Sequence, residues 1–196
     1  TVPTWRKDCD CSADLSEEVA RMYGYDKIES KTPELIMARG GQAPIEDGKD
    51  MIRDTLTGIG LDEVMTYSFY NAQVFDNLGL PADDSRRKAL QIINPISDDF
   101  RTIRTTLTPC LLSTVAYNQA RQSERTAIFE VGRVFIPKTL PLTDFPEEKM
   151  VLAIAMSGKR NPLSWNTAKD AIDFYDIKGA LEEVMDSLQV KGLSYG

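Results

Sequence analysis

The stretch MVLAIAM at residues 150–156 restricts the possible folds of this chain more than any other part of its sequence. It is apolar almost throughout, whereas a strand with one wet face alternates apolar and polar side chains. It is also far shorter than the ~18 consecutive apolar residues that indicate a membrane span. We therefore expect residues 150–156 to form a central strand covered on both faces, which requires packing elements on two sides of a sheet.

Helices are expected where apolar residues recur at helical spacing. Ser12 is the expected N-cap of the first helix, whose apolar stripe contains Leu15, Val19 and Met22, and Gly24 follows where a helix commonly ends. Helices are predicted over residues 13–23, 46–57, 72–78, 106–122 and 174–188.

Strands are expected between these helices. Residues 63–70 alternate in polarity, which predicts a half-buried strand with Met65, Tyr67 and Phe69 on its apolar face. Further strands are predicted over residues 88–93, 127–131 and 133–136, the last two interrupted at Gly132. Because helices and strands lack the regular order of a parallel sheet, the predicted fold class is α+β, an antiparallel sheet flanked by helices.

Residues 29–44 break the periodic pattern and indicate a domain boundary. They contain Pro33, Gly40, Gly41 and Pro44, which interrupt helices and strands alike. The whole chain has 196 residues, which fits one domain, or one domain with an appendage.

Composition excludes several kinds of chemistry. The sequence contains no histidine, which removes Ser/His/Asp and Cys/His triads and HExxH zinc sites. A net charge of -7 argues against a module whose main task is to wrap nucleic acid. The three cysteines, Cys9, Cys11 and Cys110, are sparse and odd in number, which is typical of a reducing compartment. We expect a cytoplasmic protein.

Carboxylates gather at the start of the first predicted helix. Asp14, Glu17 and Glu18 stand at i, i+3 and i+4, and Asp8 lies in the segment that leads into the helix. Carboxylates placed in this way could hold a hard cation such as Mg²⁺. From the spacing alone, the simpler interpretation is that they complement the helix dipole and that Glu17 pairs with Arg21.

Basic residues bracket the helix predicted over 106–122. Arg101, Arg104, Arg121 and Arg125 could contact RNA phosphate or a partner carboxylate, although ordinary surface ion pairs are the commoner use of such residues. No Walker loop, GxGxxG after a strand or GxSxG occurs in the sequence.

Several stretches resemble, in order along the chain, the bacterial phenylalanine–tRNA ligase beta subunit family. They are VPTWRKD at 2–8, ADLSEEVARMYGYDKI at 13–28, GLDEVMTYSF at 60–69, INPISDDFRTIRTTLTPCLL at 93–112, IFEVGRVF at 128–135 and DFYDIKGALE at 173–182. The resemblance implies that residues 1–34 are the C-terminal part of a B5 domain. It implies that residues 35–196 are a catalytic-like core module with the class II aminoacyl-tRNA synthetase fold, truncated at its C-terminus.

The resemblance also implies that this module is a degenerate copy of an active site. A working class II site holds the ATP phosphate with an Arg-x-Glu on one strand, but here Ile128 stands where the arginine would precede Glu130. We therefore expect no catalytic and no ATP-binding residue in this chain, and we expect ATP and phenylalanine to react on the alpha subunit. The implied partners are that alpha subunit, in an alpha2beta2 heterotetramer, and tRNA through the full assembly, with no membrane.

Magnesium is the cofactor that the resemblance implies. Members of the family are described as sharing Mg²⁺ with the alpha subunit through a D-x5-D-x2-E-E pattern, and Asp8, Asp14, Glu17 and Glu18 reproduce it. The expected metal ligands are therefore these four carboxylates.

Assembly with an alpha subunit implies an exposed apolar patch, which we place on the helix that carries Leu107 to Val115. Two other functions stay open. One is a metal-dependent hydrolase built on the carboxylates at the first helix, and the other is an RNA-binding module centred on Arg101 to Arg125.

Overall fold

The computed structural model describes residues 2–34, 36, 40–161, 164–166 and 168–192. The chain divides into two compact units, Thr1–Gly41 and Gln42–Gly196. This division falls inside the segment 29–44, whose prolines and glycines interrupt the periodic pattern. The domain boundary at residues 34 and 35 that the family resemblance implies stays a prediction.

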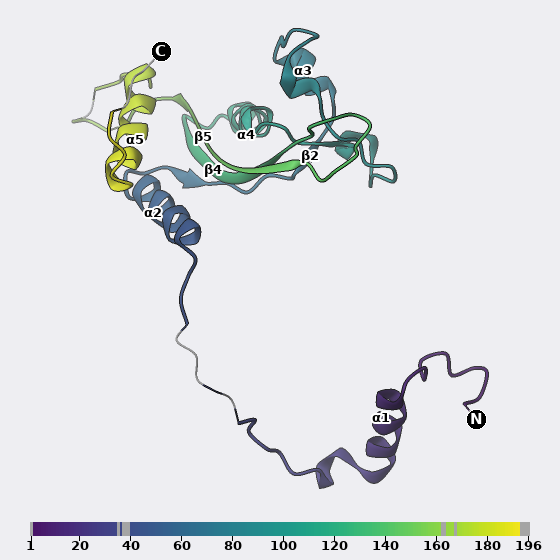
Figure 1. Cartoon of the computed structure of the whole chain (residues 1–196). Helices are drawn as coiled ribbons and strands as arrows, with labels where there is room; N and C mark the ends of the chain where they lie inside the picture. The colour runs from purple at the N-terminus through teal and green to yellow at the C-terminus, as the bar shows by residue number, and fades with distance from the viewer. Residues whose placement is uncertain (1, 35, 37–39, 162–163, 167, 193–196) are drawn as a thin grey trace. The chain divides into compact units, whose positions relative to one another are not determined.

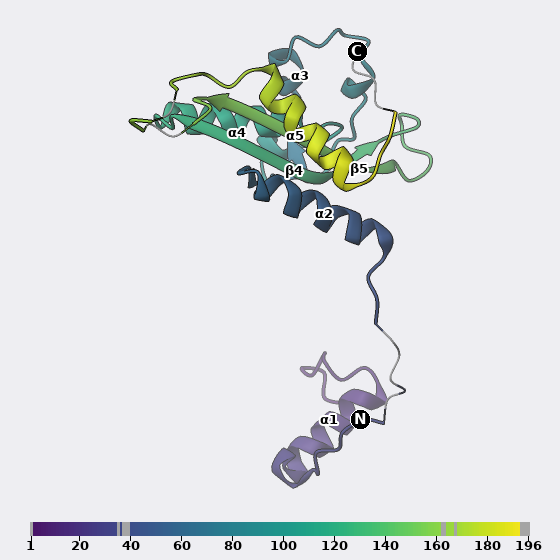
Figure 2. The same cartoon turned by 90° about the vertical axis from the view of Figure 1, so that its left-hand side faces the viewer.

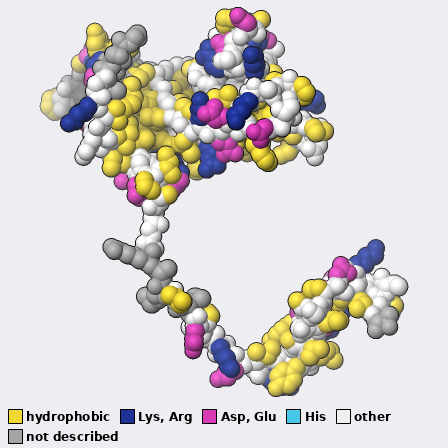
Figure 3. Space-filling view, in the orientation of Figure 1, with side chains coloured by type: hydrophobic (Ala, Val, Ile, Leu, Met, Phe, Trp, Pro, Cys, Tyr) yellow, Lys and Arg dark blue, Asp and Glu magenta, His cyan; other side chains and the backbone are white. Residues whose placement is uncertain are grey.

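The first unit contains the helix α1 (Ser12–Tyr23) and the short 3-10 helix η1 (Tyr25–Lys27). The N-cap of α1 is Cys11, one residue before the predicted Ser12, because the Asp14 carboxylate accepts the backbone N–H of Cys11 at 2.8 Å. The apolar stripe is present but uncovered, since Val19 and Met22 are 69% and 77% exposed. Figure 3 shows hydrophobic side chains gathered along this helix.

The second unit is a sheet with helices on both faces. The sheet consists of β1 (Asp62–Glu63), β4 (Arg125–Ile136) and β5 (Glu147–Gly158), in the order β1-β4-β5. Helices α2 (Pro44–Gly58) and α5 (Phe174–Ser187) cover one face, and α4 (Thr108–Ala120) covers the other (Figures 1 and 2). The larger core lies under α2 and α5, around the fully buried Leu56 and Phe129.

The observed helices confirm most of the predicted ones. In α4, Leu107, Leu111 and Val115 are buried as expected, because they face the sheet, whereas Ala116 is exposed. The stripe of Leu107, Leu111 and Val115 therefore lies inside the fold, whereas Leu112 and Tyr117 on the same helix are 47% and 58% exposed. The exposed patch expected on this helix stays a prediction. Within the described residues no helix combines the length and apolar character that crossing a membrane requires.

The order of strands in the sheet corrects the prediction for residues 150–156. The central strand is β4, which runs without interruption through Gly132. Within the residues that the structure describes, β5 pairs with β4 alone. Residues 150–157 of β5 are half-buried throughout, which explains their apolar character without a central place. The pairing of β1 with β4 is parallel, so the sheet is mixed where a wholly antiparallel one was predicted.

The segment of residues 64–70 lies beside β4 and continues from β1 into β2 (Phe69–Tyr70). Its exposure alternates as predicted, but with the opposite phase: Met65 and Tyr67 are 91% and 73% exposed, while Tyr70 is buried. Strand β2 pairs antiparallel with β3 (Thr102–Ile103) in a separate small sheet. The strand predicted over 88–93 is reduced to a bridge between Gln91 and Thr102.

Short helices complete the second unit between these strands. They are α3 (Gln73–Asn77) and the 3-10 helices η2 (Ser85–Arg87) and η3 (Asp98–Phe100). Phe75 of α3 packs edge-on against Tyr70, with ring centroids 5.5 Å apart, in a small core of its own. This core supports the end of the 64–70 segment.

Candidate functional site

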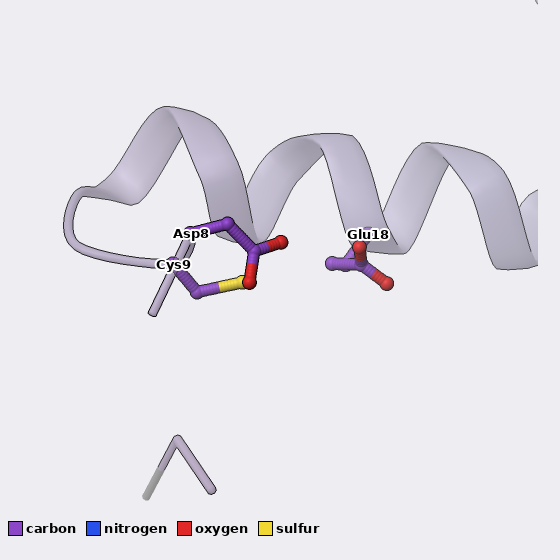
Figure 4. A group of neighbouring side chains, drawn as sticks. All are labelled: Asp8, Cys9 and Glu18. Carbon is purple, nitrogen blue, oxygen red and sulfur yellow. The ribbon is translucent and has the colours of Figure 1, made fainter. Parts of the chain in front are cut away.

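Arg6 is the centre of the charged cluster at the start of α1. Its Nη2 lies 2.8 Å from Asp8 Oδ2 and 2.6 Å from Glu18 Oε1, so one guanidinium joins the two carboxylates. Arg21, one turn further along α1, donates to the other oxygen of Glu18 at 2.7 Å. Figure 4 shows Asp8 and Cys9, from the segment before the helix, on the side of α1 from which Glu18 projects.

These contacts change the proton affinities of the cluster. Hydrogen bonds from Arg6 and Arg21 lower the pKa of Glu18 to about 2, and the bond from Arg6 lowers the pKa of Asp8. Burial raises the pKa of the Cys9 thiol. At neutral pH the cluster therefore presents two carboxylates already held by a cation beside a protonated thiol.

The structure brings together two of the four predicted metal ligands. A carboxylate oxygen of Asp8, one of Glu18 and the Cys9 sulfur all lie within 4.8 Å of one another. Asp14 is engaged elsewhere, because its Oδ2 accepts the backbone N–H groups of Asp10 and Cys11 at 2.8 Å, which lowers its pKa. Glu17 is exposed and lies outside this group.

The donors of this group fit a magnesium ion only in part. Two carboxylate oxygens suit a hard cation, whereas a thiol does not, and Mg²⁺ takes about six oxygen ligands. An ion bound here would have to displace Arg6 and would need further oxygens from water or a partner. Arg6 was not among the site residues predicted from the sequence, although an arginine two residues before Asp8 can compete with a metal ion for that carboxylate.

A second charged pair is buried in the second unit. Arg104 Nη1 lies 2.7 Å from Glu130 Oε1, and the two side chains are only 5% and 4% exposed. The hydroxyl of Thr66 donates to the other oxygen of Glu130 at 2.6 Å and lies 3.2 Å from Arg104 Nη1. Charge and hydrogen-bonding capacity are thus satisfied inside this network, as a buried ion pair requires.

Gly132 makes room for this pair on the same strand. A Cβ at this position would lie 2.6 Å from Arg104 Nη2 and 2.9 Å from Glu130 Oε1, closer than atoms can approach. The glycine that was expected to interrupt the strand therefore leaves space for the Arg104–Glu130 pair.

Of the four arginines proposed for RNA contact, Arg104 is excluded by its burial. Arg101 pairs with Asp98 at 2.8 Å, and the Arg121 guanidinium stacks 3.3 Å from the centre of the Tyr117 ring. Arg125 donates to the carbonyl of Gly60 at 3.2 Å. The buried Arg104 contradicts the prediction that these residues act together at the surface.

A hollow of about 550 Å³ lies between the 64–70 segment, η3 and the start of α4. Met65, Tyr67 and Phe69 line it from the segment, and Phe100 contacts Tyr67 edge-on at 5.4 Å. Ile93 and Ile96, which precede η3 in the sequence, are 97% and 99% exposed. Exposed apolar side chains thus border a hollow that the start of α4 also lines, and we call the hollow with its 64–70 wall the apolar face.

Comparison with known proteins bears on both units. Residues 28–196 match the family model described as "Phenylalanyl tRNA synthetase beta chain CLM domain", and residues 1–25 match the "tRNA synthetase B5 domain". The chain is 40% identical over 189 residues to the phenylalanine–tRNA ligase beta subunit of Symbiobacterium thermophilum, covering 96% of this chain and 21% of the relative. It is 38% identical over 195 residues to that of Geobacter sulfurreducens, covering 100% of this chain and 24% of the relative.

Solved structures show the same fold at low sequence identity. The pyrrolysyl-tRNA synthetase from Desulfitobacterium hafniense superposes with a TM-score of 0.57 at 13% identity, over 77% of this chain and 49% of that chain. This likeness shows that most of the chain shares the fold of a pyrrolysyl-tRNA synthetase. The chain spans less than a quarter of the length of the two curated relatives, so it corresponds to part of a larger subunit in them.

Proposed function

The chain belongs to the phenylalanyl-tRNA synthetase beta chain family, and we propose that it serves as a non-catalytic interface module in such a ligase. Its partner is the alpha subunit, which attaches phenylalanine to tRNA with ATP in the cytoplasm. The two form an alpha2beta2 heterotetramer, and tRNA meets this chain only through the full assembly.

The observation that carries the proposal is the apolar face. Met65 and Tyr67 are 91% and 73% exposed, although the segment that carries them is hydrogen-bonded to β4. Exposed apolar and aromatic side chains gathered beside a hollow are typical of a protein–protein interface. The alternating phase of residues 64–70 supports this, because it presents the large side chains outward.

The buried ion pair supports the absence of catalysis. Phosphoryl transfer needs cationic groups free to approach the developing charge. On the central strand, Ile128 stands where a working class II site has an arginine that holds the ATP phosphate. The guanidinium of Arg104 is buried against Glu130. A module built in this way supports a catalytic partner and does not bind the nucleotide itself.

The proposal includes a shared magnesium site at α1. Asp8 and Glu18 would supply carboxylate oxygens, and Asp14 and Glu17 complete the family pattern that these residues reproduce. The alpha subunit or water would supply the remaining ligands. The ion would offset the repulsion of carboxylates that meet across the subunit boundary.

Co-purification of this chain with its cognate alpha subunit tests the interface. We expect a stable complex, and we expect phenylalanine-dependent ATP–pyrophosphate exchange from preparations that contain the alpha subunit and none from this chain alone. Failure to form a complex contradicts the interface role, and exchange activity of the chain alone contradicts the non-catalytic role. Repeating the co-purification with a magnesium chelator tests the ion.

A further inference from the structure

We infer that Arg104 is the positioning residue of the apolar face: it holds residues 64–70 against β4 so that Met65 and Tyr67 are presented to the partner. This inference rests on the proposed interface function. It assigns a specific task to a side chain that never reaches the surface.

Arg104 connects segments that are far apart in the sequence. Its backbone N–H donates to the carbonyl of Ser68 at 2.9 Å, and its backbone carbonyl accepts the N–H of Phe135 at 3.0 Å. Its Nε donates to the carbonyl of Arg133 at 2.7 Å. One residue therefore joins the 64–70 segment to the central strand, between two sheets that share no strand.

Thr66 transmits this connection to the apolar face. Its hydroxyl is bonded to Glu130 at 2.6 Å and lies near Arg104, while the residue itself lines the hollow between Met65 and Tyr67. In an extended segment neighbouring side chains point to opposite sides. Fixing the side chain of Thr66 inward therefore directs those of Met65 and Tyr67 outward.

A planar guanidinium is needed for this arrangement. Arg104 donates through separate nitrogens to the carbonyl of Arg133 and to the Glu130 carboxylate, and its Nη2 lies 2.6 Å from the place a Cβ at position 132 would take. A lysine ammonium has the charge but is a single point on a flexible stem. It cannot make both bonds in one plane.

The matched variants Thr66→Val and Thr66→Ser separate positioning from stability. Both alter a half-buried side chain slightly, but only the serine keeps the hydroxyl that bonds Glu130. We expect the valine variant to bind the alpha subunit about tenfold more weakly than the unmodified chain, and the serine variant to bind normally. Affinity is measured by calorimetry at a temperature where circular dichroism shows every protein folded.

Arg104→Lys and Val184→Ala complete the test. Val184 is buried in the core under α2 and α5, on the opposite face of the sheet, so its truncation lowers stability without moving the apolar face. We expect weakened binding from Arg104→Lys and normal binding from folded Val184→Ala. Normal binding by Thr66→Val overturns the positioning role even if the Arg104 variant does not fold, whereas no binding by the unmodified chain overturns the proposed function itself.

Discussion

At the scale of single residues, the fold depends on places where one atom more or less changes the packing. Gly132 is such a place, because the Arg104–Glu130 pair occupies the space that any side chain there would need. Arg6 is a second residue with a large local effect, because its guanidinium lowers the pKa of two carboxylates, those of Asp8 and Glu18.

Replacing Gly132 by alanine is expected to lower the free energy of unfolding by about 1–3 kcal/mol, because the new methyl group must displace a buried ion pair. Urea unfolding followed by circular dichroism measures the change. Gly179→Ala in α5 is the control: a Cβ there meets no atom within 4 Å, and we expect a gain of about 0.5–1 kcal/mol. Equal effects of the two substitutions would contradict the steric explanation.

Replacing Arg6 by glutamine is expected to raise the pKa of both Glu18 and Asp8, because the hydrogen bonds from Arg6 are the main cause of their lowering. Carboxyl resonances followed by NMR during an acid titration measure both values. Arg21→Gln, which removes the second partner of Glu18 alone, is the matched control and should leave Asp8 unchanged.

The bonds of Glu18 to Arg6 and Arg21 make the stability of the first unit depend on pH. The folded pKa of Glu18 is about 2, below its ordinary value of 4.5, so the bonds to Arg6 and Arg21 stabilise the first unit above pH 4.5. This contribution is lost as the pH falls from 4.5 toward 2. We expect the α1 resonances to change over that range, and a transition centred above pH 5 would contradict the assignment.

At the scale of elements, stability comes from the packing of α2 and α5 on the sheet. Leu56 is fully buried in this core, whereas Met51 on the same helix is 43% exposed. We expect Leu56→Ala to cost about 2–5 kcal/mol of unfolding free energy, and Met51→Ala less than about 1 kcal/mol. Similar costs for both, measured by urea unfolding, would show that α2 does not pack on the sheet in this way.

Elements whose apolar residues recur at a regular spacing were predictable from the sequence. The elements that they pack against were not. The helix stripe through Leu111 and Val115 correctly gave the buried face of α4, because burial on a helix follows one period. For residues 64–70 the sequence predicted the right period but the wrong phase, because large apolar side chains are usually buried and Met65 and Tyr67 are exposed. Residues 150–156 are apolar because they are half-buried. Composition alone cannot distinguish a half-buried strand at the edge of a sheet from a central strand.

The candidate site was predictable in part for the same reason. Helical spacing places Asp14, Glu17 and Glu18 together, but it contains no information on the segment that folds back with Arg6 and Asp8. The pairing of Arg104 with Glu130 joins residues 26 positions apart, and no local pattern announces it.

At the scale of the whole molecule, the proposed interface function predicts that the apolar face contacts the alpha subunit. Tyr67→Asp should abolish or strongly weaken co-purification with the alpha subunit, because it places a charge in an apolar contact. Tyr175→Asp is the matched control, since the two tyrosines are 73% and 74% exposed and Tyr175 lies on α5, away from the apolar face. An equal loss from both substitutions would place the contact elsewhere.

The outer flank of β5 has a practical consequence for anyone who handles this chain alone. Along that flank, within the described residues, an apolar strand presents backbone groups that no neighbouring strand takes up. Such a flank is a template on which another copy can add, so concentrated stocks should form strand-paired aggregates that bind thioflavin dyes. A lysine in place of Val151 should slow this aggregation, because the positive charges of neighbouring copies would repel one another.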